Sequence, residues 1–182
     1  MHVLIGVTGS IAASKTPHLV TACVSRGDSV RVVMTDSAQR FVGPETFRSL
    51  SGNPVITSLW LDQEQFSTLH VNLAEWADVI AVVPATANII GKLACGVLDD
   101  VLTCIIYAAD CPVLVAPAMN TNMWRHPVVQ ENCRKLRAAG YHLVEPETGR
   151  LASGAVGVGR LADIDGIADA VSRLVEPAED EH

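Results

Sequence analysis

The sequence predicts a three-layer α/β/α sandwich in which helices cover both faces of a parallel β-sheet. Short apolar runs rich in β-branched residues recur along the chain, at 3–7, 30–34, 79–83, 112–116 and 141–144. They are apolar at successive positions, as strands buried on both faces are. Between them lie segments of helical length, at 14–26, 88–94, 98–107 and 128–139, the last followed by Gly140 as a helix cap. This alternation is typical of a doubly wound sheet, whose ligands bind beyond the carboxyl ends of the strands.

Length and composition limit the organisation of the chain. Its 182 residues predict one domain over 1–176 and a disordered acidic tail over 177–182. Hydrophobic residues make up 49% of the chain, yet no apolar run approaches the roughly 18 residues of a membrane span. We therefore expect no membrane contact and assign the apolar surplus to subunit interfaces. The net charge of −7, with basic residues scattered along the chain, argues against a nucleic-acid surface.

The cysteines indicate the compartment. There are five of them, an odd number, and they show neither a CxxC motif nor the spacing of a metal site. They predict buried thiols in a reducing environment and no bound metal. The chain also opens directly on the strand-like HVLIGV, without the charged and apolar regions of a signal peptide. We therefore expect a cytoplasmic protein.

Polar residues follow the first two strands. Gly9 and Ser10 lie in VTGSIAASK, and Thr35 and Ser37 follow the second strand. Neither GxGxxG nor the lysine-containing P-loop is present, so the first loop alone indicates an ordinary strand-to-helix turn. Together, hydroxyls and helix N–H groups at one sheet edge favour the phosphate of a mononucleotide.

The next two strand ends carry longer motifs. The strand over 79–83 is followed by PATAN (84–88), where Pro84 is expected to end the strand and Thr86 and Asn88 to cap the following helix or line a site. The strand over 112–116 is followed by PAMNTNMW (117–124). Its two Asn, two Met and one Trp predict a pocket for a flat, partly apolar ligand and a carboxylate.

Two further features have more than one interpretation. His70 precedes the strand over 79–83, and a lone histidine is more often structural than catalytic, although a neutral imidazole can accept a proton from a thiol or an alcohol. The stretch LASGAVGVGR (151–160) is rich in glycine. It can hold a phosphate, cover a substrate or simply turn the backbone.

Taken together, GSIA (9–12), TDSA (35–38), His70, PATAN and PAMNTNMW resemble the flavin-containing cysteine decarboxylases, over residues 3 to about 175. This family includes phosphopantothenoylcysteine decarboxylase, the peptidyl-cysteine decarboxylases of lantibiotic and related peptide biosynthesis, and the halotolerance proteins. The resemblance implies a Rossmann-like, flavodoxin-like flavoprotein. It also implies a homotrimer, often assembled further into a dodecamer, with FMN (FAD being the alternative) held between subunits.

The resemblance also implies roles for individual residues. His70 takes the position of the catalytic base, and Asn120 is expected to bind the substrate carboxylate in a pocket shaped by Met123. Thr86 stands where serine is usual, and Ile89 where threonine is frequent. The residues expected at the flavin phosphate are Gly9, Ser10, Ile11, Thr35 and Ser37, and those lining its ring system and ribityl chain are Thr86, Ala87, Asn88 and Ala118.

The glycine-rich stretch matches the family's substrate flap, which reads ACGD in the pantothenate-pathway enzymes. Here it reads Ala152-Ser153-Gly154-Ala155. A serine hydroxyl cannot replace a reactive thiol in returning hydrogen to the product. Ser153 is therefore expected to contact a substrate that leaves as an enethiol, and the glycines to make the flap a mobile lid.

These departures from the flap motif favour oxidative decarboxylation of the C-terminal cysteine of a precursor peptide, the step that precedes formation of an aminovinyl-cysteine ring. One alternative is a phosphopantothenoylcysteine decarboxylase of coenzyme A biosynthesis that completes reduction by another route. Another is a flavin-binding regulatory subunit similar to the halotolerance proteins, which the presence of both His70 and Asn120 disfavours. A flavin prenyltransferase is disfavoured by His70 and PAMNTNMW.

Overall fold

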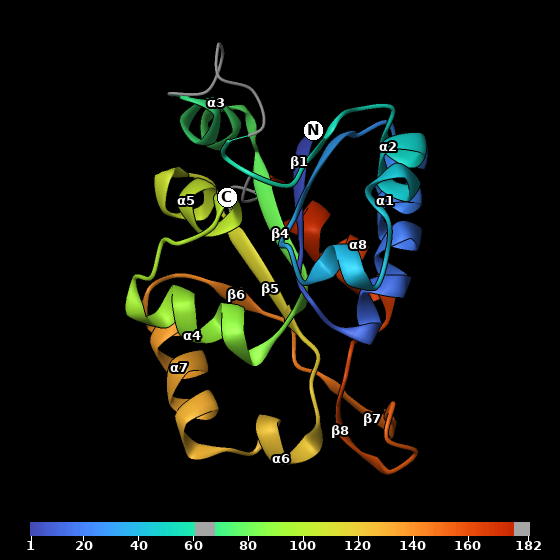
Figure 1. Cartoon of the computed structure of the whole chain (residues 1–182), viewed down its shortest axis with the longest axis vertical. Coiled ribbons are helices and arrows are strands. Elements are labelled where there is room, and N and C mark those ends of the chain that lie inside the picture. Colours follow the sequence, from blue (N-terminus) through green and yellow to red (C-terminus); the bar gives the residue numbers. More distant parts are fainter. Residues whose placement is uncertain (61–67, 177–182) are drawn as a thin grey trace, which may run out of the picture.

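The computed structural model describes residues 1–60 and 68–176, and a six-stranded parallel sheet forms its centre (Figure 1). The strand order is β3-β2-β1-β4-β5-β6, so the order reverses between β1 and β4. A separate antiparallel hairpin consists of β7 and β8. The strands are β1 (His2–Val7), β2 (Ser29–Met34), β3 (Val55–Ile56), β4 (Val79–Ala85), β5 (Val113–Pro117), β6 (His142–Leu143), β7 (Glu147–Arg150) and β8 (Val156–Arg160).

Helices cover both faces of the sheet, which confirms the predicted three-layer, Rossmann-like sandwich (Figure 1). One face packs against α1 (Thr16–Ser25), α2 (Pro44–Ser51) and α8 (Ile164–Arg173). The other face packs against α3 (Leu69–Trp76), α4 (Ala87–Cys95), α5 (Val101–Ala108) and α7 (Pro127–Ala138). The short helices are η1 (Ile11–Lys15), η2 (Ala38–Arg40) and α6 (Thr121–Trp124).

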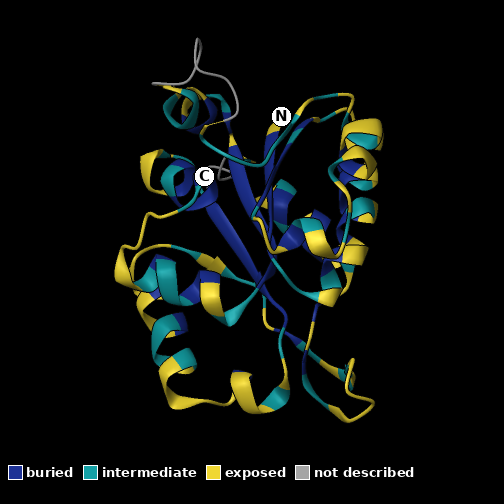
Figure 2. Cartoon of the chain, viewed as in Figure 1, coloured by how far each residue is buried: buried dark blue, intermediate teal, exposed yellow. Residues whose placement is uncertain are grey.

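Alternate residues of each central strand serve opposite faces. Val3 and Ile5 of β1 belong to the core under α1, α2 and α8, whereas Leu4 between them belongs to the core under the other four helices. All three are completely buried. Figure 2 shows the result as a buried sheet between helices whose outer surfaces are exposed. Burial on both faces explains why the strands are apolar at successive positions.

The strand predicted to end at Pro84 in fact continues through Ala85, which pairs with Pro117 of β5. The register shifts between Val82 and Ala85, because proline has no N–H to donate to the ladder and pairing resumes only after it. The helix predicted from residue 98 begins instead at Val101, because Asp100 forms a capping box with Thr103. The short β3 strand, the helices α2, α3 and α8 and the β7–β8 hairpin were not predicted.

The cysteines differ from the prediction of five buried thiols. Cys23 and Cys133 are buried, Cys104 and Cys111 are half-buried, and Cys95 is exposed. Burial raises the pKa of the Cys23 thiol to about 11. No helix among residues 1–60 and 68–176 is long and apolar enough to cross a membrane. The tail predicted over 177–182 lies outside the described residues.

Candidate active site at the sheet edge

The loops that follow β1 and β4 meet at the point where the strand order reverses. The hydroxyl of Thr8 donates a hydrogen bond to the carbonyl oxygen of Pro84 (2.7 Å) and accepts one from the N–H of Thr86 (3.1 Å). Thr8 is buried, so these bonds fix both loops from inside. Ligands of doubly wound sheets bind in the crevice at this position.

Gly9 allows the loops after β1 and β2 to touch. A Cβ atom at Gly9 would collide with the Cβ of Ser37, so only glycine permits this approach. The N–H of Thr35 donates to the carbonyl oxygen of Val7 (3.1 Å) and places Thr35 beside the same turn. The two loops thus bring backbone and hydroxyl groups together where the sequence predicts the flavin phosphate.

The start of α4 combines capping with site lining. The hydroxyl of Thr86 accepts a hydrogen bond from the N–H of Ile89 (3.3 Å), so Thr86 is the helix N-cap. Ile89 is buried in the core, where a threonine hydroxyl would find an apolar environment. Asn88 is exposed within α4 and does not cap it.

The PAMNTNMW segment turns into α6 beside this helix start. The N–H of Ala118 donates to the carbonyl oxygen of Ala85 (3.0 Å), which ties the segment to PATAN. Asn120 is the N-cap of α6, and its side-chain oxygen accepts a hydrogen bond from the N–H of Asn122 (2.8 Å). Met123 is 48% exposed, but Trp124 is buried in the core, so the prediction that the tryptophan belongs to the pocket is wrong.

The glycine-rich stretch (151–160) forms the turn and the second strand of the β7–β8 hairpin, with Ser153 in the turn. The hydroxyl of Thr121 donates to the carbonyl oxygen of Val158 (2.7 Å). A Cβ atom at Gly157 would collide with the side chain of Thr121. Gly157 therefore allows the hairpin to pack closely against α6. The sequence had instead suggested that the glycines of this stretch make a lid mobile.

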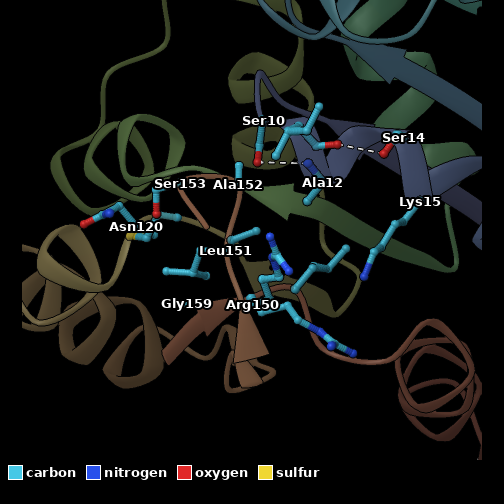
Figure 3. Close-up of a pocket in the computed structure, with 15 residues that line it drawn as sticks. Ser10, Ala12, Ser14, Lys15, Asn120, Arg150, Leu151, Ala152, Ser153 and Gly159 are labelled. Atoms are coloured by element: carbon cyan, nitrogen blue, oxygen red, sulfur yellow. Dashed lines mark hydrogen bonds between the residues drawn. The ribbon is translucent and has the colours of Figure 1, made fainter. Parts of the chain in front are cut away.

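Two cavities divide the predicted site residues between them. The first, about 570 Å³, is lined by Ser10, Ile11, Ala118, Asn120 and Ser153, among others (Figure 3). The second, about 470 Å³, is lined by Gly9, Thr35, Ser37, Thr86, Ala87, Asn88 and Met123, among others. Both volumes fall in the range of small-molecule sites. The structure thus gathers predicted residues from five separate loops at one edge of the sheet.

His70 lines neither cavity. It lies in the first turn of α3 and is half-buried. Along the long axis of the molecule, α3 lies at the opposite end from α6 and the β7–β8 hairpin (Figure 1). A single chain therefore does not bring His70 to Asn120.

The two cavities differ in charge. Among the described residues that line the first cavity there are three cations, Lys15, Arg150 and Arg160, and no carboxylate. The sequence did not single out these three residues, because Lys15 lies far along the chain from Arg150 and Arg160 and no spacing indicates that they meet. The second cavity has one cation, Lys92, and the three carboxylates of Asp36, Asp99 and Asp100.

Lys92 is engaged within the chain. Its ammonium contacts the carboxylates of Asp99 (2.6 Å) and Asp100 (2.9 Å). Burial opposes the charged form of Lys92, but the hydrogen bonds to Asp99 and Asp100 outweigh it and raise the pKa of Lys92 above its usual value. The same contact lowers the pKa of Asp99. No group of three or more His, Cys, Asp or Glu within the described residues could hold a metal ion.

Comparison with known proteins supplies the family. The family model described as Flavoprotein matches residues 1–176. The coenzyme A biosynthesis bifunctional protein CoaBC of Bacillus subtilis is 47% identical over 166 residues, which are 91% of this chain and 41% of that protein. The CoaBC of Mycolicibacterium smegmatis is 42% identical over 177 residues, 97% of this chain and 42% of that protein. The chain thus spans less than half the length of these relatives.

Solved structures show the same fold. A cysteine-to-serine mutant of PPC (phosphopantothenoylcysteine) decarboxylase, complexed with pantothenoylaminoethenethiol, matches with a TM-score of 0.84 and 36% identity over 94% of this chain and 96% of that one. The FMN-dependent cysteine decarboxylase SpaF matches with a TM-score of 0.83 and 35% identity over 97% of this chain and 98% of that one.

Proposed function

The chain belongs to the Flavoprotein family, and we propose that it is a flavin-dependent cysteine decarboxylase whose substrate is phosphopantothenoylcysteine. The family and the flavin cofactor expected from the sequence are thereby confirmed. FMN is the proposed form of the flavin, since SpaF is described as FMN-dependent. The CoaBC relatives favour this substrate over the peptide C-terminus that the flap sequence had suggested first.

The observation that carries the proposal is the placing of Asn120 and Ser153 in one cavity beside the flavin-lining loops. The bond from Ala118 N–H to Ala85 oxygen sets PAMNTNMW directly against PATAN. A substrate held by Asn120 would therefore lie next to the residues proposed to contact the flavin. This proximity is what an oxidation of the substrate by the flavin requires.

Asn120 is proposed to orient the substrate carboxylate. Its side-chain oxygen already accepts a hydrogen bond from Asn122, so the free part of the amide is its NH2 group. An NH2 group donates hydrogen bonds, and a carboxylate accepts them. The cap of α6 thus presents the correct polarity to the group that leaves as CO2.

When bound, the flavin supplies the two-electron acceptor that converts the Cβ–S unit of the cysteine into a thioaldehyde. The neighbouring carboxylate then leaves as CO2, because the thiocarbonyl accepts its electron pair. The product is an enethiol. The residues of the chain position the substrate, exclude water and remove the thiol proton.

His70 is the proposed acceptor of that proton. Because His70 and Asn120 lie at opposite ends of one chain, they can act on one substrate only if they come from different subunits (Figure 1). This geometry supports the homotrimer, and its further assembly into a dodecamer, that the family resemblance implies. In such an assembly α3 of a neighbouring subunit would place its His70 beside Asn120 and complete the site.

Ser153 determines the fate of the product in this proposal. A structural neighbour in which serine replaces a cysteine is complexed with an enethiol, pantothenoylaminoethenethiol. We take that cysteine to be the flap residue whose place Ser153 occupies. The chain with Ser153 is then expected to release the enethiol, while the electron pair removed from the substrate passes to an external acceptor such as O2.

A peptide ending in cysteine is the second candidate substrate. It is supported by the likeness to SpaF and by Ala155, which stands where the pantothenate-pathway flap has an acidic residue. The aminovinyl-cysteine step of lantibiotic and related ribosomally made, modified peptides (RiPPs) would use the same chemistry. The two candidates share the reaction and differ in what the cysteine is attached to.

Mass spectrometry of the purified flavin-loaded protein distinguishes these candidates. The protein is incubated separately with phosphopantothenoylcysteine and with short peptides ending in cysteine. Loss of CO2 and two hydrogens from the first, with the peptides unchanged, is the expected result. Conversion of the peptides alone would establish the second candidate, and loss of CO2 alone would show that the product is reduced. A flavin-loaded protein that converts neither would contradict the proposal and favour a regulatory subunit.

A further inference from the structure

We propose that Lys15, Arg150 and Arg160 form an anion site that holds the phosphate of the substrate and makes the enzyme prefer phosphorylated cysteine conjugates over unphosphorylated ones. This inference rests on the proposed function and assigns its substrate specificity to named residues. Lys15 is the last residue of VTGSIAASK and Arg160 the last residue of LASGAVGVGR, but neither stretch by itself indicates that these cations meet Arg150. They are proposed as substrate-binding groups with no part in the chemical step.

Three separate elements bring these cations to one cavity. Lys15 is the last residue of η1, the short helix that follows the turn at Gly9. Arg150 is the last residue of β7, and Arg160 is the last residue of β8. All three line the first cavity. In Figure 3 the Lys15 side chain extends from its helix toward the side of the cavity where Arg150 lies.

Gly149 leaves room for the side chain of Arg160 against β7. A Cβ atom at Gly149 would lie 2.9 Å from Cδ and 3.2 Å from Nη1 of Arg160, so the Arg160 side chain lies across Gly149, the residue next to Arg150. Glu147 contacts Nη2 of Arg160 at 3.2 Å and holds it in this position. The guanidinium of Arg160 is therefore fixed beside the backbone that carries Arg150.

The charge of the cavity matches a phosphate. The chain as a whole carries a net charge of −7, yet no carboxylate is among the described residues that line this cavity. A phosphate monoester carries a charge of roughly −1.5 to −2 near pH 7. Arginine binds phosphate oxygens through two parallel N–H groups, and lysine contributes a point charge. A peptide C-terminus offers no second anion of this kind.

Either the flavin or the substrate could supply the phosphate, and the division of residues between the cavities favours the substrate. Three of the five residues proposed for the flavin phosphate, Gly9, Thr35 and Ser37, line the other cavity, whereas Ser10 and Ile11 line the cavity of the three cations. The three cations instead share a cavity with Asn120 and Ser153, the residues proposed to contact the substrate. An elongated substrate with its carboxylate at Asn120 would extend its phosphate toward Arg150.

The test compares kcat/KM for phosphopantothenoylcysteine and for pantothenoylcysteine in the flavin-loaded protein. Arg150→Ala and Lys15→Ala are expected to lower kcat/KM for the phosphorylated substrate roughly tenfold or more each, the loss of one charge-assisted hydrogen bond. The unphosphorylated substrate should be converted equally well by all variants. Arg173→Ala and Lys135→Ala remove matched exposed charges that line neither cavity and should change neither value.

Other results would overturn the assignment. If Arg150→Ala and Lys15→Ala lower kcat/KM equally for both substrates, or for neither, the cations do not select the phosphate. If the variants lose FMN while the preference for phosphorylated substrate persists, the site belongs to the flavin phosphate.

A binding measurement separates failure of this inference from failure of the proposed function. Calorimetry compares phosphopantothenate with pantothenate on the flavin-loaded protein and on Arg150→Ala. Tighter binding of phosphopantothenate that Arg150→Ala abolishes supports the anion site even if no cysteine substrate is converted. Equal binding of both compounds would refute the anion site even if decarboxylation is observed.

Discussion

Met119 and Gly159 join the flap hairpin to the substrate-binding loop. The N–H of Met119 donates to the carbonyl oxygen of Gly159 at 2.9 Å. Gly159 has a φ of 129°, and a Cβ atom there would collide with the carbonyl oxygen of Met119. The hairpin that carries Ser153 is thus positioned by the residue that precedes Asn120.

Gly159→Ala should separate these two segments. Both the positive φ and the collision oppose a side chain here, and we expect the free energy of unfolding to fall by about 1–3 kcal/mol. Decarboxylation should fall with it, because Ser153 and Arg150 move together with the hairpin. Urea unfolding and turnover measure the two effects.

Gly166→Ala is the matched control. Gly166 lies inside α8 with open space around its Cα, and alanine favours a helix over glycine by about 1 kcal/mol. This variant should be at least as stable as the parent and fully active. A Gly159→Ala protein with unchanged stability and turnover would show that the hairpin does not depend on this contact.

Mixed oligomers test whether His70 and Asn120 act from different subunits. His70→Asn removes the proton acceptor, and Asn120→Asp places a negative charge against the substrate carboxylate. Aspartate still caps α6, so Asn120→Asp should keep the fold. His70 lines neither cavity, so the visible flavin absorbance should persist in His70→Asn as well. Each variant alone should lose turnover.

Co-expression of the two variants under separate affinity tags should restore part of the turnover, because some interfaces then combine an intact His70 with an intact Asn120. Co-expression of each variant with itself is the control. Mixed oligomers as inactive as their parents would place both residues in one subunit's site. Full turnover by His70→Asn alone would remove this residue from the mechanism.

Ser153→Cys should change the product. Ser153 is exposed in the hairpin turn, so the substitution should leave stability within about 0.5 kcal/mol of the parent. A thiol at this position can donate a proton to the enethiol while the reduced flavin, when bound, would return the two electrons, and we expect a larger fraction of saturated thiol. Ser153→Ala serves as the control, and the ratio of the two products by mass spectrometry is the measurement. An identical ratio in all three proteins would contradict the role given to Ser153.

Cys23 should make stability depend on alkaline pH. Burial, followed by the charge of Asp28, raises the pKa of this thiol from 9.0 to about 11. The unfolded chain therefore loses this proton at lower pH than the folded chain, so stability should decline as the pH rises from about 9 to about 11. Urea unfolding at about pH 8 and at about pH 10.5 measures the decline.

Cys23→Ala should flatten that decline, although the variant loses some stability at every pH because it leaves a cavity. Cys95→Ala, which removes an exposed thiol, should leave the pH dependence unchanged. If Cys23→Ala and the parent lose the same stability between the two pH values, the buried thiol has no part in the decline.

The sequence by itself determined five of the six strands of the described sheet and the positions of the site loops that follow them. Runs such as 3–7 and 79–83 are apolar at every residue because Val3 and Leu4 enter different cores, and this pattern is visible without coordinates. PATAN and PAMNTNMW come at the carboxyl ends of two adjacent parallel strands, so both lie at the same edge of the sheet. A local pattern predicts these strands and the loops that follow them, because apolar residues at successive positions indicate a strand that is buried on both faces.

Only the tertiary structure decided how distant residues combine. The second strand of the β7–β8 hairpin is held against α6 and its preceding loop because Gly157 and Gly159 pack against Thr121 and Met119, which are far from them in sequence. The gathering of Lys15 with two arginines of that hairpin, and the distance of His70 from Asn120, likewise depend on chain packing (Figures 1 and 3). Residue type fixes which groups can act, but long-range contacts fix which of them meet, and no local pattern encodes those contacts.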